Sequence, residues 1–500
     1  MNEKISIPLR TGPVLPVLAF VLLLSGCMVG PKYQRPSAPA PQVYKGASPA
    51  DYKETNGWKP AQPNDQILRG KWWEVYNDPA LNALEEQVNI SNQNVLSFEA
   101  QFREAREVVR AARASLFPTI STAPAITNSS SSGNLYGGNG QLSGLTTQRT
   151  TYNLPVDFSY QADIWGSIRR TVTADVNTAQ ATAAQLENAR LSYQATLAED
   201  YFALHGTDGD VDLLTTTVQS YQDYLQLTKN RFDAGVASDA DVSQAETQLN
   251  TTRAQLIDYG VTRAQYEDAI AVLTGKPPAA LSIPKMVLKT PPPPIPVAVP
   301  ATLLERRPDI AGAERQMAAA NEQIGIATAA YYPTVTLGGA AGFESSDITK
   351  WFAWSSRLWS VGPQLAETLF DAGRRRAQVG SAKAFYDATV ADYRQTVLTA
   401  FQQVEDNLAA LRILANEAQV QDEAVRSANR SLSVSTEQYK AGTADYLQVI
   451  TTQTIALADQ KTAVDLLTRR LTSSVLLVEA LGGGWDTSRL PTRDAIIHGK

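Results

Sequence analysis

Few side chains in this sequence are of the types that carry out chemistry. Its 500 residues include one cysteine, Cys27, and two histidines, His205 and His498. Neither histidine has a partner at the spacing of a metal site, and no second cysteine is present, so zinc binding and nucleophilic catalysis have little support. We therefore expect no catalytic residue, no metal site and no cofactor. An enzyme, such as an envelope hydrolase, would lack a site.

Cys27 stands at the end of an export signal. Two basic residues precede the apolar segment 14–24, which is too short to span a bilayer. The sequence Leu24-Ser25-Gly26-Cys27 resembles the lipobox of bacterial lipoproteins, which implies cleavage after residue 26 and acylation of Cys27. Met28 stands where an Asp would favour the inner membrane, so this resemblance points to outer-membrane lipid. The alternative is an ordinary signal peptide with a stray cysteine near its end.

A second group of candidate residues surrounds two Ala-Gly turns. Gly235 and Gly442 supply the left-handed residue that ends a helix and reverses the chain. In an oligomer each acidic residue nearby becomes a ring that favours cations. We expect these turns to dock a partner and the side chains around them to form a gate: Asp239, Asp241, Tyr439, Asp445 and Gln448.

Each of these gate residues also has a purely structural reading. Asp239 can cap the helix that follows the first turn, and the other carboxylates can simply be solvated. Tyr439 can equally be the last apolar residue of its helix. The gate is therefore a hypothesis about position, with its chemistry left open.

The chain contains an internal repeat. Gly166 and Gly235 recur as Gly373 and Gly442, at a constant offset of 207 residues. Each copy has the same order of expected elements, which is a helix, two strands, a very long helix, a tight turn and a returning helix.

Two very long helices dominate this repeat. Apolar residues recur with four-and-three spacing through 166–233 and 373–440, which predicts amphipathic helices about 100 Å long. The shorter helices near 80–116 and 238–273 would match one long helix if stacked end to end. Because an amphipathic helix of this length must bury its apolar face along its whole length, it needs neighbours throughout.

The segments between the helices alternate apolar and polar residues. We expect strands at about 118–165 and about 333–371, with period-two patterns in 149–165, 334–343 and 354–370. Their tryptophans fit the aromatic girdles of a membrane barrel, although a soluble hairpin packed on a helix would read the same way. Four strands cannot close a barrel, since eight is the observed minimum, so membrane strands would require several chains.

These patterns divide the chain into consecutive segments. We expect a signal peptide at 1–26 and an irregular lipidated segment at 27–77. The first repeat spans 78–275, with its tip turn at about 234–238, and a proline-rich linker follows at 276–303. The second repeat spans 304–482, with its tip turn at about 441–445, and an irregular tail occupies 483–500.

The net charge of the chain limits the classes of partner that it can bind. The net charge of −6 argues against nucleic acid. The basic run Arg374-Arg375-Arg376 can be read as an anion site, but we favour an anchor for the start of a helix just inside the membrane.

Several motifs resemble a known family. The start Cys27–Pro36, the pair Trp72-Trp73 before Asp78–Leu81, and the segment Leu303–Ile310 look like the NodT subgroup of TolC-like outer membrane factors. The resemblance implies a mainly α-helical fold with a β-barrel part, in which three chains build a twelve-strand barrel continuous with a twelve-helix periplasmic barrel. It also implies a periplasmic adaptor and an inner-membrane pump as partners, and a second-repeat tip that closes the resting channel.

The sequence departs from the family's better-known gate. Ala444 stands where an Arg can occur, and Gln448 and Thr451 stand where Asp can occur. This puts a salt-bridged lock in doubt.

These observations predict a passive outer-membrane duct for small molecules. Protein secretion through the same kind of duct and a coiled-coil scaffold lipoprotein without a pore are the alternatives. The lipobox and the NodT-like start favour small molecules, while matched aromatic hairpins in both repeats argue against the scaffold. The substrate cannot be read from the sequence.

Overall fold

The computed structural model describes residues 28–41, 44–45, 70–131, 147–295 and 303–498. The expected signal peptide and Cys27 lie outside the described residues. The helices are α2 (Pro79–Ser91), α3 (Gln93–Ala114), α4 (Ser167–Asp233), α5 (Asp239–Leu273), α6 (Leu303–Arg306), α7 (Pro308–Ala329), α8 (Arg374–Lys440), α9 (Tyr446–Ala480) and α10 (Arg493–His498). The strands are β1 (Thr119–Thr122), β2 (Ala125–Ser131), β3 (Thr147–Ala162), β4 (Thr334–Ser345) and β5 (Arg357–Ala366).

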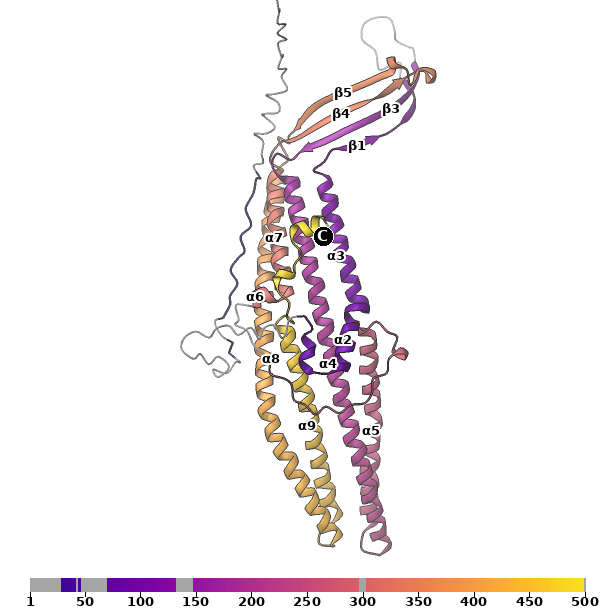
Figure 1. Ribbon diagram of the computed structural model, residues 1–500, viewed down its shortest axis with the longest axis vertical. Coiled ribbons are helices and arrows are strands. Elements are labelled where there is room, and N and C mark those ends of the chain that lie inside the picture. Colours follow the sequence, from indigo (N-terminus) through magenta and orange to yellow (C-terminus); the bar gives the residue numbers. More distant parts are fainter. Residues whose placement is uncertain (1–27, 42–43, 46–69, 132–146, 296–302, 499–500) are drawn as a thin grey trace, which may run out of the picture.

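The molecule is elongated, with a sheet at one end and two helical hairpins at the other (Figure 1). Helices α4 and α8 have 67 residues each and run from the sheet to the far tips. Each begins after a glycine in the left-handed conformation, Gly166 with φ 80° and Gly373 with φ 87°. The same backbone solution therefore turns a strand into a long helix in both repeats.

The sheet is antiparallel, with β3 and β4 at its centre. Its order is β1-β3-β4-β5, and β2 also pairs with β3 beyond the end of β1. Pro124 separates β1 from β2, and because proline has no N–H to donate, one expected strand becomes two segments on the same edge. The two outer positions, β1 with β2 on one side and β5 on the other, have no further strand partner among the described residues.

The shorter helices stack end to end beside the long ones. Asn92 is the N-cap of α3: its side-chain oxygen accepts from Val95 N, and its Nδ2 donates to Leu273 O at 2.8 Å. Arg307, the residue before α7, likewise donates from Nη1 to Ala480 O at 2.9 Å. The last carbonyls of α5 and α9 are thus bound by the first residues of α3 and α7.

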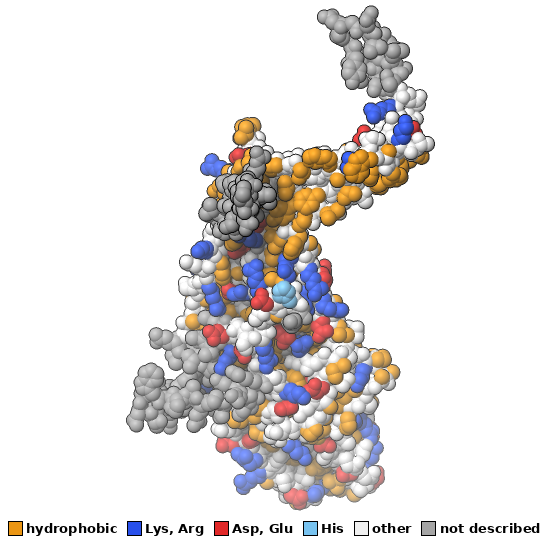
Figure 2. Space-filling view, turned by 45° about the horizontal axis from the view of Figure 1, so that its top comes forward, with side chains coloured by type: hydrophobic (Ala, Val, Ile, Leu, Met, Phe, Trp, Pro, Cys, Tyr) orange, Lys and Arg blue, Asp and Glu red, His pale blue; other side chains and the backbone are white. Residues whose placement is uncertain are grey.

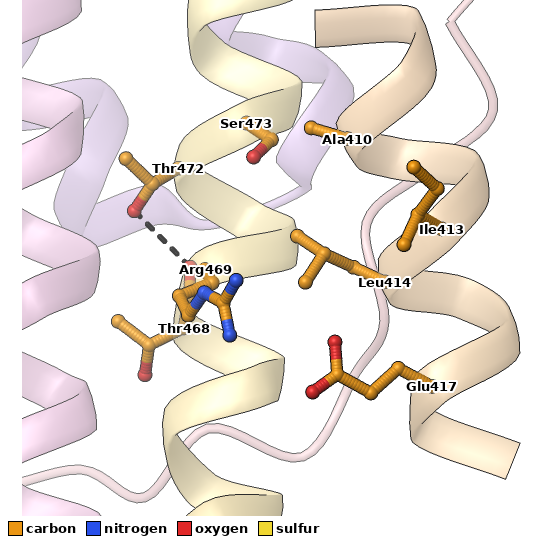
Figure 3. Close-up of a pocket in the computed structure, with 8 residues that line it drawn as sticks. All are labelled: Ala410, Ile413, Leu414, Glu417, Thr468, Arg469, Thr472 and Ser473. Carbon is orange, nitrogen blue, oxygen red and sulfur yellow. Dashed lines mark hydrogen bonds between the residues drawn. The ribbon is translucent and has the colours of Figure 1, made fainter. Parts of the chain in front are cut away.

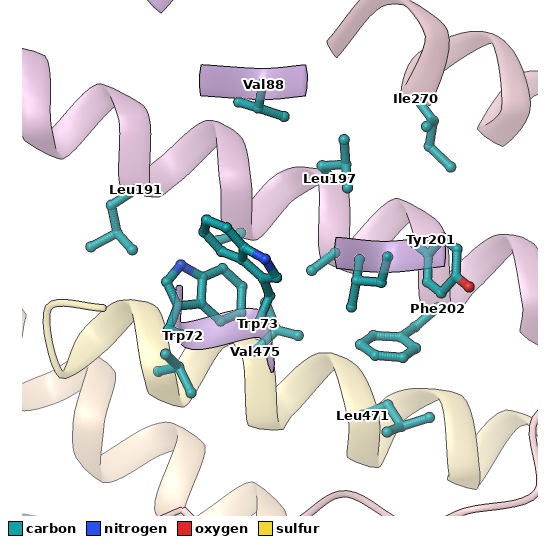
Figure 4. Packing of buried hydrophobic residues seen from close by; sticks show 14 of the residues in the cluster. Trp72, Trp73, Val88, Leu191, Leu197, Tyr201, Phe202, Ile270, Leu471 and Val475 are labelled. Carbon is teal, nitrogen blue, oxygen red and sulfur yellow. The ribbon is translucent and has the colours of Figure 1, made fainter. Parts of the chain in front are cut away.

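The main hydrophobic cluster lies midway along the molecule. Trp72 and Trp73 are almost fully buried, and their rings meet edge to face at 5.8 Å. They lie among Leu197 and Tyr201 of α4 and Val475 of α9 (Figure 4). The short 3₁₀ helix at Trp72–Tyr76 therefore packs the N-terminal part of the chain between the two repeats.

Both ends of the described chain lie along the helical layer. The segment 28–41, which we call the strap, follows α7 and α8. Val29 N donates to Trp165 O at 3.2 Å, and the Tyr33 hydroxyl donates to Glu314 at 2.6 Å. The tail, expected to be irregular, instead forms the short helix α10. Ile496 of α10 is fully buried against α3 and α4, a tertiary contact that local sequence does not announce.

No helix in the described part of the chain is both long and apolar enough to cross a membrane.

Candidate functional site at the helical tips

The two tip turns have the same backbone geometry. Gly235 and Gly442 have φ angles of 74° and 76°, which a residue with a side chain adopts only with strain. Val236 N donates to Arg231 O, and Thr443 N donates to Gln438 O, both at 2.9 Å. These bonds satisfy the last carbonyls of α4 and α8, so each turn is a firm helix end.

Two of the three acidic candidate residues near the turns take part in helix capping, but not in the way that the sequence suggested. Ser238 is the N-cap of α5, and the expectation that Asp239 might cap this helix is wrong. Asp239 is merely exposed in the first turn. Asp241 completes a capping box, since its carboxylate accepts from the Ser238 N and Oγ at 2.8 Å each. Asp445 caps α9 by accepting from Gln448 N at 3.0 Å, so it is more than a solvated charge.

Tyr439 is buried inside the tip. Its side chain is 3% exposed, and its hydroxyl donates to Thr228 Oγ1 of α4 at 3.2 Å. Its ring meets that of Tyr446 at 5.4 Å, within a small cluster that also contains Val449 and Ala245. Within one chain, Tyr439 therefore packs as the last apolar residue of α8, which is one of the two roles that the sequence allowed.

Arg231 joins the first hairpin to the second. Its Nη1 donates to the Tyr439 carbonyl at 2.9 Å, and its guanidinium lies 4.6 Å from the centre of the Tyr439 ring. Higher up, the hydroxyls of Tyr224 and Thr436 form a hydrogen bond of 2.8 Å between α4 and α8. We call the contacts of Arg231 and Thr228 with Tyr439 the tip latch.

Sequence reasoning did not select Arg231 as a functional residue. The partner that it binds lies 208 residues away, and no local pattern reveals such a contact. One signal was present, because Arg231 and Gln438 occupy equivalent places in the two repeats and differ in charge. Gln448 contacts Gln438 within its own hairpin at 3.3 Å. A role for Asp241, Gln448 and Asp445 in closing a pore between copies of the chain stays a prediction.

At the opposite end, apolar side chains cover the sheet (Figure 2). Trp359 is 78% exposed, and Val361 and Leu365 of the same strand are about as exposed. The basic run at the start of α8 lies directly after this strand. Arg375 binds Asp371 at 2.7 Å and the Thr368 carbonyl at 2.6 Å, which is how it anchors the start of the helix.

The groove between α8 and α9 carries little chemistry. It has a volume of about 430 Å³ and is lined by Ile413, Leu414, Glu417, Arg469 and small hydroxyl residues (Figure 3). It contains no pairing of a nucleophile with a base. Among the described residues, no three His, Cys, Asp or Glu side chains are arranged to hold a metal ion.

Comparison with known proteins identifies the class that this geometry defines. The model of the outer membrane efflux protein family matches residues 84–276 and 299–483, that is, both repeats. The chain therefore belongs to the outer membrane efflux protein family. Membership in its NodT subgroup stays a prediction.

Individual relatives agree over nearly the whole length. The chain is 31% identical over 470 residues to the probable efflux pump outer membrane protein SepC of Pseudomonas putida, covering 94% of this chain and 96% of SepC. The toluene efflux pump outer membrane protein TtgF of Pseudomonas putida matches with the same identity and coverage. The solved structure of the outer-membrane channel OprN is 26% identical, with a TM-score of 0.81 over 92% of this chain and all of that one. The expected fold class, a helical barrel continuous with a β-barrel, is confirmed.

Proposed function

We propose that this outer-membrane efflux component is the passive exit duct of a three-part machine, formed by three copies of the chain. The observation that carries the proposal is a pair of free edges. The sheet ends at β1 with β2 on one side and at β5 on the other. The helical layer runs α3-α4-α7-α8, so it ends at α3 on the first side and at α8 on the second.

Closure between copies would satisfy both layers at once. An open strand edge in lipid leaves unpaired backbone groups, so β5 of one copy should pair with β1 and β2 of the next. The same rotation would place α8 against the neighbour's α3. Exposed apolar residues in the part of α8 nearest the sheet, such as Phe385 and Leu398, support a covered face there. Three copies would give twelve strand positions, which agrees with the resemblance that the sequence shows.

The tips are the proposed docking place for a periplasmic adaptor, which an inner-membrane pump would supply with substrate. They lie at the end of α4 and α8 farthest from the sheet, roughly 100 Å away by helix rise. Gly235 and Gly442 hold both turns in fixed conformations. We infer that the tip latch keeps the two hairpins of one chain together in the resting duct, and that the adaptor loosens it.

Small apolar molecules are the proposed cargo. TtgF is named for a toluene efflux pump, and a passive tunnel needs no catalytic group or cofactor. Protein secretion through the same duct is the second candidate, although no observation favours it.

Acylation of Cys27 is the proposed anchor to outer-membrane lipid, supported by the sequence Leu24–Cys27. Mass spectrometry of the mature N-terminus tests it, and an unmodified Cys27 would contradict it.

A cellular assay tests the function. Deleting the gene should raise the accumulation of toluene or of a fluorescent apolar dye, and the wild-type gene should restore export. A variant with Gly235→Val and Gly442→Val should insert in the membrane but fail to restore export, because both docking turns are distorted. Unchanged accumulation after deletion would argue against this role.

A further inference from the structure

A second site lies close to the sheet, away from the tips. A groove of about 640 Å³ runs between the strap, α7 and α8. Its polar lining comes from all three segments, and it includes Lys32, Gln34, Asn321, Tyr331, Lys383 and Tyr386. The groove is thus assembled from parts of the chain that are about 300 residues apart in sequence.

The groove carries uncompensated positive charge. Lys32 and Lys383 are both exposed, and neither forms an ion pair with any described residue. No carboxylate among the described residues lines the groove, although the exposed Asp387 lies one turn beyond Lys383 on α8. Two carboxylates of α7 are engaged elsewhere. Glu314 pairs with Arg315 and accepts from the Tyr33 hydroxyl, and Glu322 pairs with the buried Arg170 at 2.6 Å. A ligand for this groove should therefore be an anion.

The position of the groove along α8 indicates which kind of anion can reach it. Lys383 lies on the same face of α8 as Arg376, which is two turns nearer the sheet, about 10 Å by helix rise. Arg376 is exposed and unpaired among the described residues. Immediately before α8, Leu369 and Phe370 are 90% and 86% exposed. Exposed apolar residues followed by unpaired cations match the order of apolar and charged layers at a membrane surface.

The strap fixes one wall of the groove at this level. Its Val29 N binds Trp165 O at the end of the sheet, and its Pro31 carbonyl accepts from the buried Arg170 at 3.2 Å. Lys32 follows directly, so these bonds hold its backbone near the end of the sheet. On the opposite wall, Arg375 lies over the ring of Tyr331 at 5.3 Å, and Tyr331 lines the groove.

We propose that this groove binds the headgroup of an anionic glycerophospholipid from the leaflet next to α8. The phosphate sits between Lys32 and Lys383, with Tyr331 and Gln34 as hydrogen-bond donors, and Arg376 contacts the same lipid nearer its acyl chains. A net negative headgroup fits better than a zwitterionic one, because two ammonium groups and, among the described residues, no carboxylate line the groove. The site would fix the depth of the protein in the membrane.

Native mass spectrometry of the detergent-solubilised protein tests the site. Wild-type protein mixed with equal amounts of phosphatidylglycerol and phosphatidylcholine should retain the anionic lipid with roughly thirtyfold preference, since two lysines contribute. The variant Lys32→Gln with Lys383→Gln should lose this preference. The matched control Arg426→Gln with Arg430→Gln, which changes two exposed arginines far down the same helix, should keep it. Oligomeric state and circular dichroism show whether each variant is folded.

Three outcomes would overturn the proposal. The first is equal retention of the two lipids by wild-type protein. The second is an undiminished preference in a folded Lys32 and Lys383 variant. The third is displacement of the lipid by inorganic phosphate at the same concentration, which would indicate a site for soluble anions.

Discussion

At the scale of single residues, Arg170 is a buried charge that joins α4, α7 and the strap. Its side chain is 2% exposed, and it binds Glu322 at 2.6 Å and the Val29 carbonyl at 2.7 Å. Replacing it leaves the Glu322 carboxylate buried without a partner and releases the strap. We expect Arg170→Met to lower the free energy of unfolding by about 3–5 kcal/mol.

Thermal unfolding in detergent measures this effect, and the neighbouring Arg169 provides the control. Arg169 binds Asp163 at 3.0 Å but is more exposed, so Arg169→Met should cost no more than about 1 kcal/mol. Equal decreases in the free energy of unfolding for the two variants would show that the buried pair contributes no more to stability than the exposed one.

Buried carboxylates make stability depend on pH. Burial, with help from Glu479 and Asp200, raises the pKa of Glu199 to about 7. Burial alone raises the pKa of Asp200 to about 6. Because the folded state then holds protons more tightly than the unfolded state, this contribution to stability is full below about pH 4 and is lost as the pH rises through 6 to 7.

The melting temperature should therefore increase as the pH falls from 8 to 5.5. Glu199→Gln should flatten this dependence, whereas Glu423→Gln, at an exposed position of α8, should leave it unchanged. A Glu199→Gln profile that parallels the wild-type profile would contradict the assignment.

The residues of the turns could be predicted from the sequence, but the residues that they contact could not. Gly235 and Gly442 were recognisable because only glycine suits their φ angles. Arg231, Thr228 and Tyr439 meet across two hairpins, and pairings at such sequence distances leave no local periodicity. The capping of α5 by Ser238 rather than Asp239 is a shift of one residue, which is within the usual uncertainty of a helix boundary.

At the scale of elements, the long helices and their reversal were predictable because periodicity and glycine turns are local signals. The break between β1 and β2 follows from Pro124, although the expected strand ignored it. The helix α10 was not predictable, because six residues have little helical stability alone and depend on the burial of Ile496.

The end-to-end joint of α5 with α2 and α3 is the element contact most open to a test. Gly275 has a φ of 71°, and a Cβ there would overlap the Ser91 carbonyl. We expect Gly275→Ala to lower the free energy of unfolding by about 1–3 kcal/mol, because strain and the displaced joint add.

Gly260 is the matched control, since it lies inside α5 with open space around its Cα. Gly260→Ala should be neutral or stabilising by up to about 1 kcal/mol. Chemical denaturation followed by circular dichroism measures both, and a harmless Gly275→Ala would mean that the stacked helices do not depend on this close approach.

At the scale of the whole molecule, the proposed duct closes the sheet edges, which have no partner among the described residues, with other copies of the chain. Light scattering of the detergent-solubilised protein, corrected for bound detergent, should give about three times the chain mass of 54.1 kDa, less the signal peptides. A single-chain mass for folded protein would leave the sheet edges unpaired and would contradict the closed barrel.

The central claim is that the molecule is a duct whose narrow end is held shut at its tips. Single-channel conductance in planar bilayers tests it most directly. The double variant Arg231→Gln with Tyr439→Phe removes the donors of the tip latch while keeping the tyrosine's packing volume. Arg253→Gln, at an exposed position of α5, is the control.

We expect small conductance steps from the wild type and the control, and steps several-fold larger from the latch variant, because the hairpins are then free to separate. Larger steps in the latch variant alone would support both the duct and its closure. The account would be contradicted if the folded, inserted latch variant conducted no better than the wild type, or if none of the three proteins conducted at all.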